Sequence, residues 1–409
     1  MVDSRFNPTD HHTTNSCHNK AHESQPHEDA AATQTNQQQQ QQQNHRMGES
    51  IAPVGGLGDA SYAANSSNQG NAVRSIYPLL QNMLLHKLLS PPEQRIVRVA
   101  DLGCSSGMNT INNMEFLLHT LKHKFINLEI EFQVFFSDLP SNDFNTLFNF
   151  LTSPDRTGRG YFFAGVPGSF YSRLFPNASL HVAFSSLSLH WISKIPDEVQ
   201  QRDCLAWNGG HVWIHDGNPK AAEAYARLAK NDLRDFLNAR SVELLPGGLL
   251  FVVMQGRSSP DSSRQYHHGD IELMSQTFPS TWNDLVAEGV IQPESRDSFN
   301  FPMYFRTKEE VLEVVRECPD LKLEHLELLD IPILGEQKQG IGSVIEDGRK
   351  LANYYRSLWG GYVDSHLGLD RAKVFHQRIE ENAIAYVQAR PERKVAYKDC
   401  ILLILTHII

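Results

Sequence analysis

The sequence VADLGCSSGMNT, residues 99–110, decides the fold class of this 409-residue chain. Apolar residues up to Ala100 are typical of the end of a buried strand, and Gly103 and Gly107 enclose a turn of small residues before the amphipathic segment 109–121. Such a turn allows a ligand to approach the backbone closely. The stretch therefore predicts a strand, turn and helix of an open α/β sheet, with a ligand at the carboxyl end of the strand.

A second strand with an acid at its end indicates which ligand this is. The apolar run 130–136 ends in Ser-Asp, so Asp101 and Asp138 are expected at one edge of a parallel sheet. A carboxylate suits a ribose, because vicinal hydroxyls are donors that need an acceptor. The turn lacks the G-x-G-x-x-G of dinucleotide folds and the Gly-Lys-Ser/Thr of a P-loop, so it offers no phosphate cradle. S-adenosylmethionine is therefore the leading ligand. The alternative is that the turn binds no ligand and its glycines only connect a strand to a helix.

Periodicity predicts one α/β domain with a helical cap. Helices are expected near 72–89, 109–122, 143–151 and 221–240, and strands near 96–100, 130–136, 180–184, 249–254 and 400–405. This alternation indicates parallel strands joined by right-handed crossovers. Polar loop and helical patterns dominate from 257 to about 355, where we expect the cap.

The first 46 residues differ in composition from the rest. They contain Gln37 to Gln43, six of the 19 histidines and no periodic apolar pattern. Such a segment cannot bury enough apolar surface to offset its ordering entropy, so we predict a disordered tail over 1–46 and a folded domain over 47–409. The tail resembles neither a secretory signal nor a transit peptide, and a cytoplasmic location is expected.

Charge and cysteine usage exclude several classes of partner. The net charge is −10, and no lysine or arginine stripe offsets it, which argues against nucleic acid or an anionic membrane as a partner. The five cysteines are scattered without CxxC spacing, so we expect reduced thiols. The longest apolar run, 400–405, is too short to span a bilayer.

Six ordered motifs resemble the plant SABATH family, whose members methylate the carboxyl groups of small acids or, in the caffeine branch, xanthine nitrogens. The motifs are GGLGDASYAANSSNQ, VADLGCSSGMNT, FFSDLPSNDFNTLF, YFFAGVPGSFYSRLFP, SLHWISKIP and RDSFNFPMYF, and the match runs from about 54 to the C-terminus. The gibberellin and indole-3-acetic acid types look most similar. The resemblance implies a Rossmann-like methyltransferase core with a mostly parallel sheet, a helical cap over the acceptor pocket, a homodimer, and a plant hormone or specialised metabolite as acceptor.

The resemblance also implies the site residues. The donor S-adenosyl-L-methionine maps onto Tyr62, Asp101, Asn109, Asp138, Leu139, Ser169 and Phe170, with Cys104 lining the site. The acceptor pocket maps onto Gln69, Leu187, His190, Trp191, Met274, Ser275 and Tyr304. Some members carry magnesium at positions that match Asn208, Asp297, Phe299 and Asn300. Only one of these four residues has a carboxylate, which is few for a magnesium site, and a hydrogen-bonded turn is the alternative.

The acceptor residues favour a particular chemistry. The amide of Gln69 and the indole N–H of Trp191 are neutral donors that can hold a carboxylate. A carboxylate is ionised at pH 7, so no general base is needed, and Gln69, His190 and Trp191 are expected to position the substrate. Leu187 and Ser275 stand where salicylate-type enzymes have aromatic residues, which favours a bulkier or more aliphatic acid.

Three alternatives remain open. A xanthine-type N-methyltransferase would share the donor site, but its acceptor is a neutral ring nitrogen, and by the resemblance the purine enzymes of the family usually lack the glutamine aligned with Gln69. A non-catalytic nucleoside-binding protein or a dehydrogenase could use the same sheet, although the pyrophosphate glycines of a dehydrogenase are missing. One departure from the family is Val54, where a lysine or glutamine commonly precedes the two glycines, and this leaves the closure of the N-terminal loop open.

Overall fold

The structure is a computed structural model that describes residues 52–88, 95–156, 158, 160–266, 277–332, 343–389 and 397–408. The predicted tail and two of the predicted acceptor residues, Met274 and Ser275, lie outside this range.

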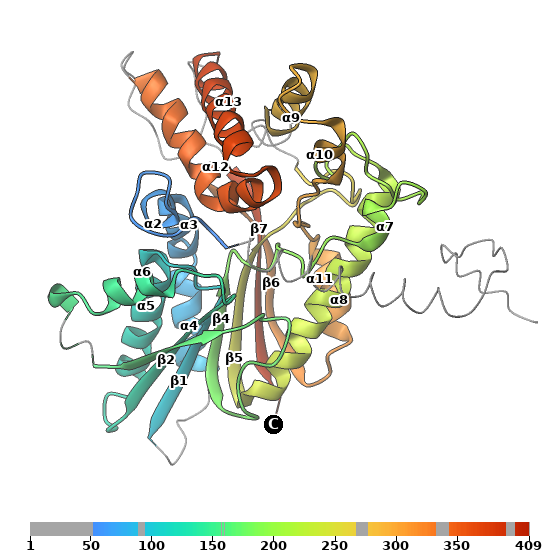
Figure 1. Ribbon diagram of the computed structural model, residues 1–409. Coiled ribbons are helices and arrows are strands. Elements are labelled where there is room, and N and C mark those ends of the chain that lie inside the picture. Colours follow the sequence, from blue (N-terminus) through green and yellow to red (C-terminus); the bar gives the residue numbers. More distant parts are fainter. Residues whose placement is uncertain are drawn as a thin grey trace, which may run out of the picture. The chain divides into compact units, whose positions relative to one another are not determined.

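A mixed sheet forms the centre of the domain (Figure 1). Within the described residues it has seven strands in the order β3-β2-β1-β4-β5-β7-β6. The strands are β1 (Ile96–Leu102), β2 (Glu131–Asp138), β3 (Phe162–Pro167), β4 (Leu180–Ser186), β5 (Leu244–Gln255), β6 (Leu321–Pro332) and β7 (Tyr397–His407). The first five pair in parallel, whereas β7 runs antiparallel to both β5 and β6. The predicted mostly parallel sheet is confirmed.

Helices cover both faces of the sheet, which explains why β4 and β5 are buried along almost their whole length. On one face lie α4 (Tyr77–His86), α5 (Met108–Lys124) and α6 (Phe144–Leu151), and on the other α8 (Pro219–Glu243) and α11 (Lys308–Arg316) (Figure 1). Leu80, Ile111 and Leu147 share one apolar cluster with Val99, whereas Phe236 of α8 belongs to the cluster on the opposite face. None of the helices in the described segments is both long and apolar enough to cross a membrane.

The cap lies at the carboxyl ends of the parallel strands (Figure 1). It consists of α9 (Phe278–Ala287), α10 (Pro293–Ser298), α12 (Ser343–Leu367) and α13 (Leu369–Gln388). An apolar cluster that includes Phe278, Trp282 and Phe375 holds these helices together and extends to Tyr225 of α8. The cap therefore continues to residue 388, beyond the predicted limit near 355.

Strand β6 falls inside the stretch that we expected to be helical. Its sequence LKLEHLELLDIP alternates only in part, because the pairing with β7 shifts register between Leu323 and His325. A bulge adds one residue to one strand, and this breaks the period of two that identifies a strand in sequence. Strand β3 was also not predicted.

Short helices complete the fold. The helix expected over 72–89 is divided into α3 (Ser67–Arg74) and α4, because Pro78 in the first turn of α4 favours a helix start there. The remaining short elements are α2 (Tyr62–Asn65), α7 (Asp197–Gln200) and the 3-10 turn η1 (Pro154–Arg156).

Candidate functional site

The turn after β1 is shaped by Gly103. This residue has a φ of 84°, and a Cβ at its position would lie 2.2 Å from the hydroxyl of Ser188, so only glycine fits. The N–H groups of Gly103 and Cys104 both donate to the Ser137 carbonyl, over 2.8 and 3.0 Å. The turn is therefore fixed against the end of β2. Burial raises the pKa of the Cys104 thiol, which stays neutral.

The two predicted carboxylates lie at neighbouring strand ends. The carboxylate of Asp138 accepts the backbone N–H of Ser105 over 2.6 Å and its own neighbour's N–H, that of Leu139, over 2.8 Å. Asp101 accepts the hydroxyl of Thr110 through Oδ2, and its Oδ1 is buried without a partner among the described residues. A buried acceptor in this state can take a donor from a ligand or from an ordered water.

Burial is the main influence on the ionisation of both groups. It raises the pKa of Asp101 to about 7, opposed by the Thr110 hydrogen bond and reinforced by the charge of Asp138. It raises the pKa of Asp138 to about 6, opposed by the two backbone hydrogen bonds. A ligand that brings hydroxyl donors and positive charge, as S-adenosylmethionine does, stabilises the ionised forms.

The N-terminal segment lies against this turn through two predicted donor residues. Asn109 donates from Nδ2 to the Ser66 carbonyl over 2.6 Å and also hydrogen-bonds the phenol of Tyr62. A Cβ on Gly107 would lie 3.3 Å from the Tyr62 ring. Burial raises the pKa of Tyr62, so its hydroxyl remains a donor at neutral pH.

Val54 closes this segment through its backbone. Its N–H donates to the Ser357 carbonyl of α12 over 2.9 Å, and its carbonyl accepts the Tyr62 N–H over 2.8 Å. The carboxylate of Asp143, at the start of α6, accepts the Gly56 N–H over 2.8 Å. The main-chain groups of this segment thus hydrogen-bond to both the cap and the core, and the side chain of Val54 takes no part in these bonds.

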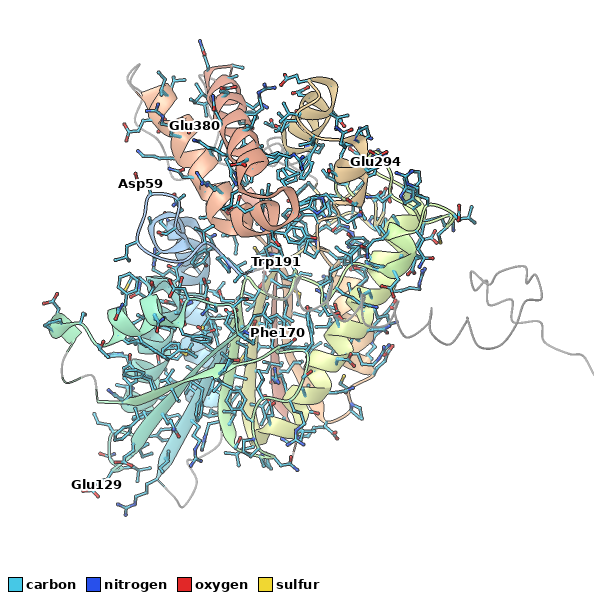
Figure 2. The ribbon with its side chains drawn as sticks, in the orientation of Figure 1. Asp59, Glu129, Phe170, Trp191, Glu294 and Glu380 are labelled. Atoms are coloured by element: carbon cyan, nitrogen blue, oxygen red, sulfur yellow. The ribbon has the colours of Figure 1, made fainter. Side chains whose placement is uncertain are left out.

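The loop after β3 brings the remaining donor residues to the same place. Gly168 donates from its N–H to the Asp138 carbonyl over 2.8 Å, and the Phe170 ring lies so close to the turn that a Cβ on Gly103 would meet it at 3.4 Å. Ser169 precedes it and accepts the Tyr171 N–H through its hydroxyl over 3.3 Å. Figure 2 shows Phe170 and Trp191 where the strand ends meet the cap.

The predicted acceptor residues after β4 form a compact segment. Leu187 has a φ of 53° and donates from its N–H to Val253 over 2.6 Å. Trp191 forms an isolated antiparallel bridge with Met303, and the carbonyl of His190 accepts the Tyr304 N–H over 2.9 Å. The 187–191 segment is therefore attached to the 303–304 segment by backbone pairing.

Gln69 lies on α3, one residue before Gly70. A Cβ on Gly70 would be 2.3 Å from Asn109 Oδ1, so this part of α3 directly contacts a predicted donor residue. The side-chain oxygen of Gln69 is buried and finds no partner among the described residues. Rotation of the amide would present its two N–H donors at the same place.

The predicted acceptor residue Tyr304 lies against a buried ion pair. Its side chain is buried, and its hydroxyl donates to Glu310 over 2.7 Å and accepts from Arg257 over 3.0 Å. Arg257 and Glu310 also pair over 2.7 Å. The hydroxyl is therefore already engaged, and only the ring of Tyr304 remains for a substrate. Neither Arg257 nor Glu310 was predicted, because a pair separated by 53 residues has no local sequence signal.

Aromatic residues beside His190 were also missed. The rings of Trp213 and Tyr266 lie 5.0 Å apart, and Phe305 lies 5.1 Å from Tyr266 and 5.8 Å from His190. The motif GGHVWI at 209–214 contains Trp213 and was the sequence signal that could have pointed to this cluster. In the structure the Trp213 indole donates to the Met303 carbonyl over 2.9 Å, which connects the motif to the 303–304 segment bonded to His190.

The predicted magnesium ligands form a hydrogen-bonded turn. Asp297 Oδ1 accepts from the Gly210 N–H over 3.0 Å and from the Arg296 guanidinium over 2.8 Å, while Asn208 donates to Asn300 Oδ1 over 3.1 Å. Phe299 packs its ring against Trp282 and offers only its carbonyl. Since an arginine occupies the one carboxylate, this set does not fit a divalent cation. Across the described ranges, no three His, Cys, Asp or Glu side chains are grouped as metal ligands.

Comparisons with known proteins agree with this geometry. A family profile described as SAM dependent carboxyl methyltransferase matches residues 48–406. Gibberellic acid methyltransferase 1 of Arabidopsis thaliana is 38% identical over 352 residues, which cover 82% of this chain and 92% of that protein. Indole-3-acetate O-methyltransferase 1 of the same plant is 37% identical over 365 residues, which cover 84% and 92%.

A solved structure extends the likeness to the fold. Loganic acid methyltransferase with SAH has a TM-score of 0.76 and 28% identity, and the match covers 87% of this chain and 99% of that one. The chain therefore belongs to the SABATH family of S-adenosylmethionine-dependent carboxyl methyltransferases.

Proposed function

We propose that this enzyme methylates the carboxylate of an acid larger or more aliphatic than salicylate, of the gibberellin or indole-acetate kind. Leu187 supports this substrate class, because an aliphatic side chain follows β4 where salicylate-type enzymes carry an aromatic ring. The names of the relatives, gibberellic acid, indole-3-acetate and loganic acid methyltransferases, support it as well.

The amide of Gln69 is the observation that carries the proposal. This amide is neutral, its Oε1 atom is buried without a hydrogen-bond partner among the described residues, and it adjoins the proposed donor residue Asn109 through Gly70. Neutral donors suit a carboxylate whose charge is consumed as the ester forms, because an arginine would stabilise the ground state more than the transition state. Gln69 and the Trp191 indole are therefore assigned to the carboxylate.

The reaction is an in-line displacement, in which a carboxylate oxygen attacks the methyl carbon as the bond to sulfur breaks. The acid is ionised at neutral pH, so no protein group has to remove a proton. The chain supplies alignment and exclusion of water, and alignment alone can contribute several kcal/mol. His190 is assigned to orientation of the substrate through its ring.

The donor-binding roles of Tyr62, Asp101, Cys104, Asn109, Asp138, Leu139, Ser169 and Phe170 are part of the same proposal. The convergence of the glycine turn, the two strand-end carboxylates and the Phe170 ring supports it. We also propose a homodimer and a cytoplasmic location, which sedimentation of the purified enzyme and imaging of a tagged chain would test.

A panel of acids with labelled donor tests the substrate class. Gibberellins, indole-acetate, farnesoate, jasmonate, cinnamate and salicylate are compared with their amides and methyl esters, which lack an ionised oxygen. We expect methylation of one or more free acids of the bulkier type and none of the amides or esters. Turnover of xanthines but of no acid would instead identify the N-methyltransferase alternative.

A further inference from the structure

Helix α8 anchors the donor loop 168–175 through a fully buried ion pair. Arg240 and Glu243 lie 2.7 Å apart and neither side chain is exposed. Arg240 donates to the carbonyls of Phe170 and Ser172, each over 3.0 Å, and Glu243 accepts the N–H groups of Leu174 and Phe175. Four backbone groups of the loop are thus held by two side chains, so the loop has a fixed place on the helix.

The acceptor segment 187–193 is anchored to the same helix by a separate set of bonds. Asp232 of α8 accepts both the N–H and the hydroxyl of Ser193, over 2.8 and 2.7 Å. Arg306 donates to the Leu189 carbonyl over 2.5 Å and to the Ala229 carbonyl of α8 over 2.7 Å. Neither set directly fixes the distance between the two loops.

Tyr171 provides that direct connection. It lies in the donor loop next to Phe170, and its hydroxyl donates to the Trp191 carbonyl over 2.5 Å. Its phenol also hydrogen-bonds Arg306, so it enters the network that holds the acceptor segment. Burial raises the pKa of Tyr171, and the charge of Asp232 raises it further while Arg306 opposes the shift. The phenol therefore keeps the proton that it shares with the Trp191 carbonyl across the physiological pH range.

We propose that Tyr171 is a positioning residue for methyl transfer, which sets the distance between the donor loop at Phe170 and the acceptor segment at Trp191. The inference rests on the proposed function, because donor and acceptor must meet in line across these two segments. Displacement of reacting groups by about 1 Å can cost on the order of 100-fold in rate. Loss of the Tyr171 hydroxyl leaves the bonds of both segments to α8 in place, so kcat should fall by less than this 100-fold.

Tyr171→Phe removes only the hydroxyl, and Tyr77→Phe is its matched control. Tyr77 donates from its hydroxyl to Asn113 over 2.8 Å between α4 and α5, on the face of the sheet opposite α8 (Figure 1). We expect kcat to fall by about tenfold in Tyr171→Phe, with the donor Kd and the acceptor KM within about twofold of the parent. Tyr77→Phe should leave all three unchanged. Equal kcat in both variants, or a loss confined to donor affinity, would contradict the proposal.

Hydrogen exchange tests the connection without any turnover. S-adenosylhomocysteine should slow amide exchange in the donor loop of the parent and of both variants. In segment 187–193 it should slow exchange in the parent and in Tyr77→Phe, but not in Tyr171→Phe. Protection of segment 187–193 that persists in Tyr171→Phe would show that this hydroxyl does not link the loops. If exchange behaves as expected but no acid is methylated, the positioning role stands and the proposed substrate class fails.

Discussion

The carboxylate of Asp143 accepts the backbone N–H of Gly56 over 2.8 Å, although 87 residues separate the two in sequence. The same carboxylate caps α6 by accepting the Thr146 N–H over 3.0 Å. A Cβ on Gly55 would lie 2.7 Å from it, so the N-terminal segment passes as close to this acid as a glycine allows. Asp143 therefore bonds both the first turn of α6 and the N-terminal segment that lies against the proposed donor site.

Two substitutions separate these roles of Asp143. Asp143→Ala should remove both and destabilise the protein by about 0.5–2 kcal/mol, as expected for a lost helix cap. Asp143→Ser keeps a capping hydroxyl but is too short for Gly56, so it should retain most of the stability and still weaken donor binding. Thermal unfolding and calorimetry with S-adenosylhomocysteine measure the two effects. Full donor affinity in both folded variants would show that the Gly56 bond does not hold the segment over the site.

Replacement of Asp138 should weaken donor binding. Hydrogen bonds to charged groups contribute roughly 1.5–3 kcal/mol, so we expect Asp138→Ala to raise the donor Kd by more than about tenfold. Asp138→Asn keeps an oxygen for one of the two N–H groups of Ser105 and Leu139, and should lose less. An unchanged Kd in a folded Asp138→Ala variant would remove the ribose assignment.

Donor affinity should rise with pH between about 6 and 7.5. The ligand-free protein raises the pKa of Asp138 to about 6 and of Asp101 to about 7, from an ordinary 3.8. The contribution of these two carboxyl groups to the stability of the ligand-free fold is therefore complete below pH 3.8, where both are protonated. It is lost as the pH rises through 6 and 7 and the groups ionise. A donor that prefers the ionised carboxylates releases protons on binding. Calorimetry in buffers of different ionisation enthalpy measures the release, and a pH-independent Kd would contradict it.

Removal of divalent cations should leave kcat unchanged. The carboxylate of Asp297 already pairs with Arg296 over 2.8 Å, and the Asn208 and Asn300 side chains bond each other. Activity after dialysis against a chelator, with and without added magnesium, measures the requirement. An activation by magnesium that Asp297→Asn abolishes would restore the predicted metal site.

The parts of this fold that repeat a local pattern could be predicted, and the parts that depend on distant partners could not. Gly103 and Asp138 stand at strand ends that alternate with helices, so their edge of the sheet follows from sequence alone. Strand β6 was missed because a bulge at Leu323 disturbs its alternation. Tyr171 was missed as a link because its partner is the carbonyl of Trp191, and every residue has a carbonyl.

Gln69 and the charge of the acceptor lead to the most discriminating prediction. Gln69→Ala should remove one donor to the carboxylate, a loss of about 0.5–3 kcal/mol, and raise the acceptor KM while the donor Kd stays constant. Gln69→Glu places a carboxylate against the substrate's own and should raise KM further. At saturating donor, kcat should increase only as the substrate acid ionises and then remain flat through neutrality, because no protein base titrates. A kcat that climbs between pH 6 and 7 for an already ionised acid, and collapses in a folded His190→Ala variant, would establish general-base catalysis by His190 instead.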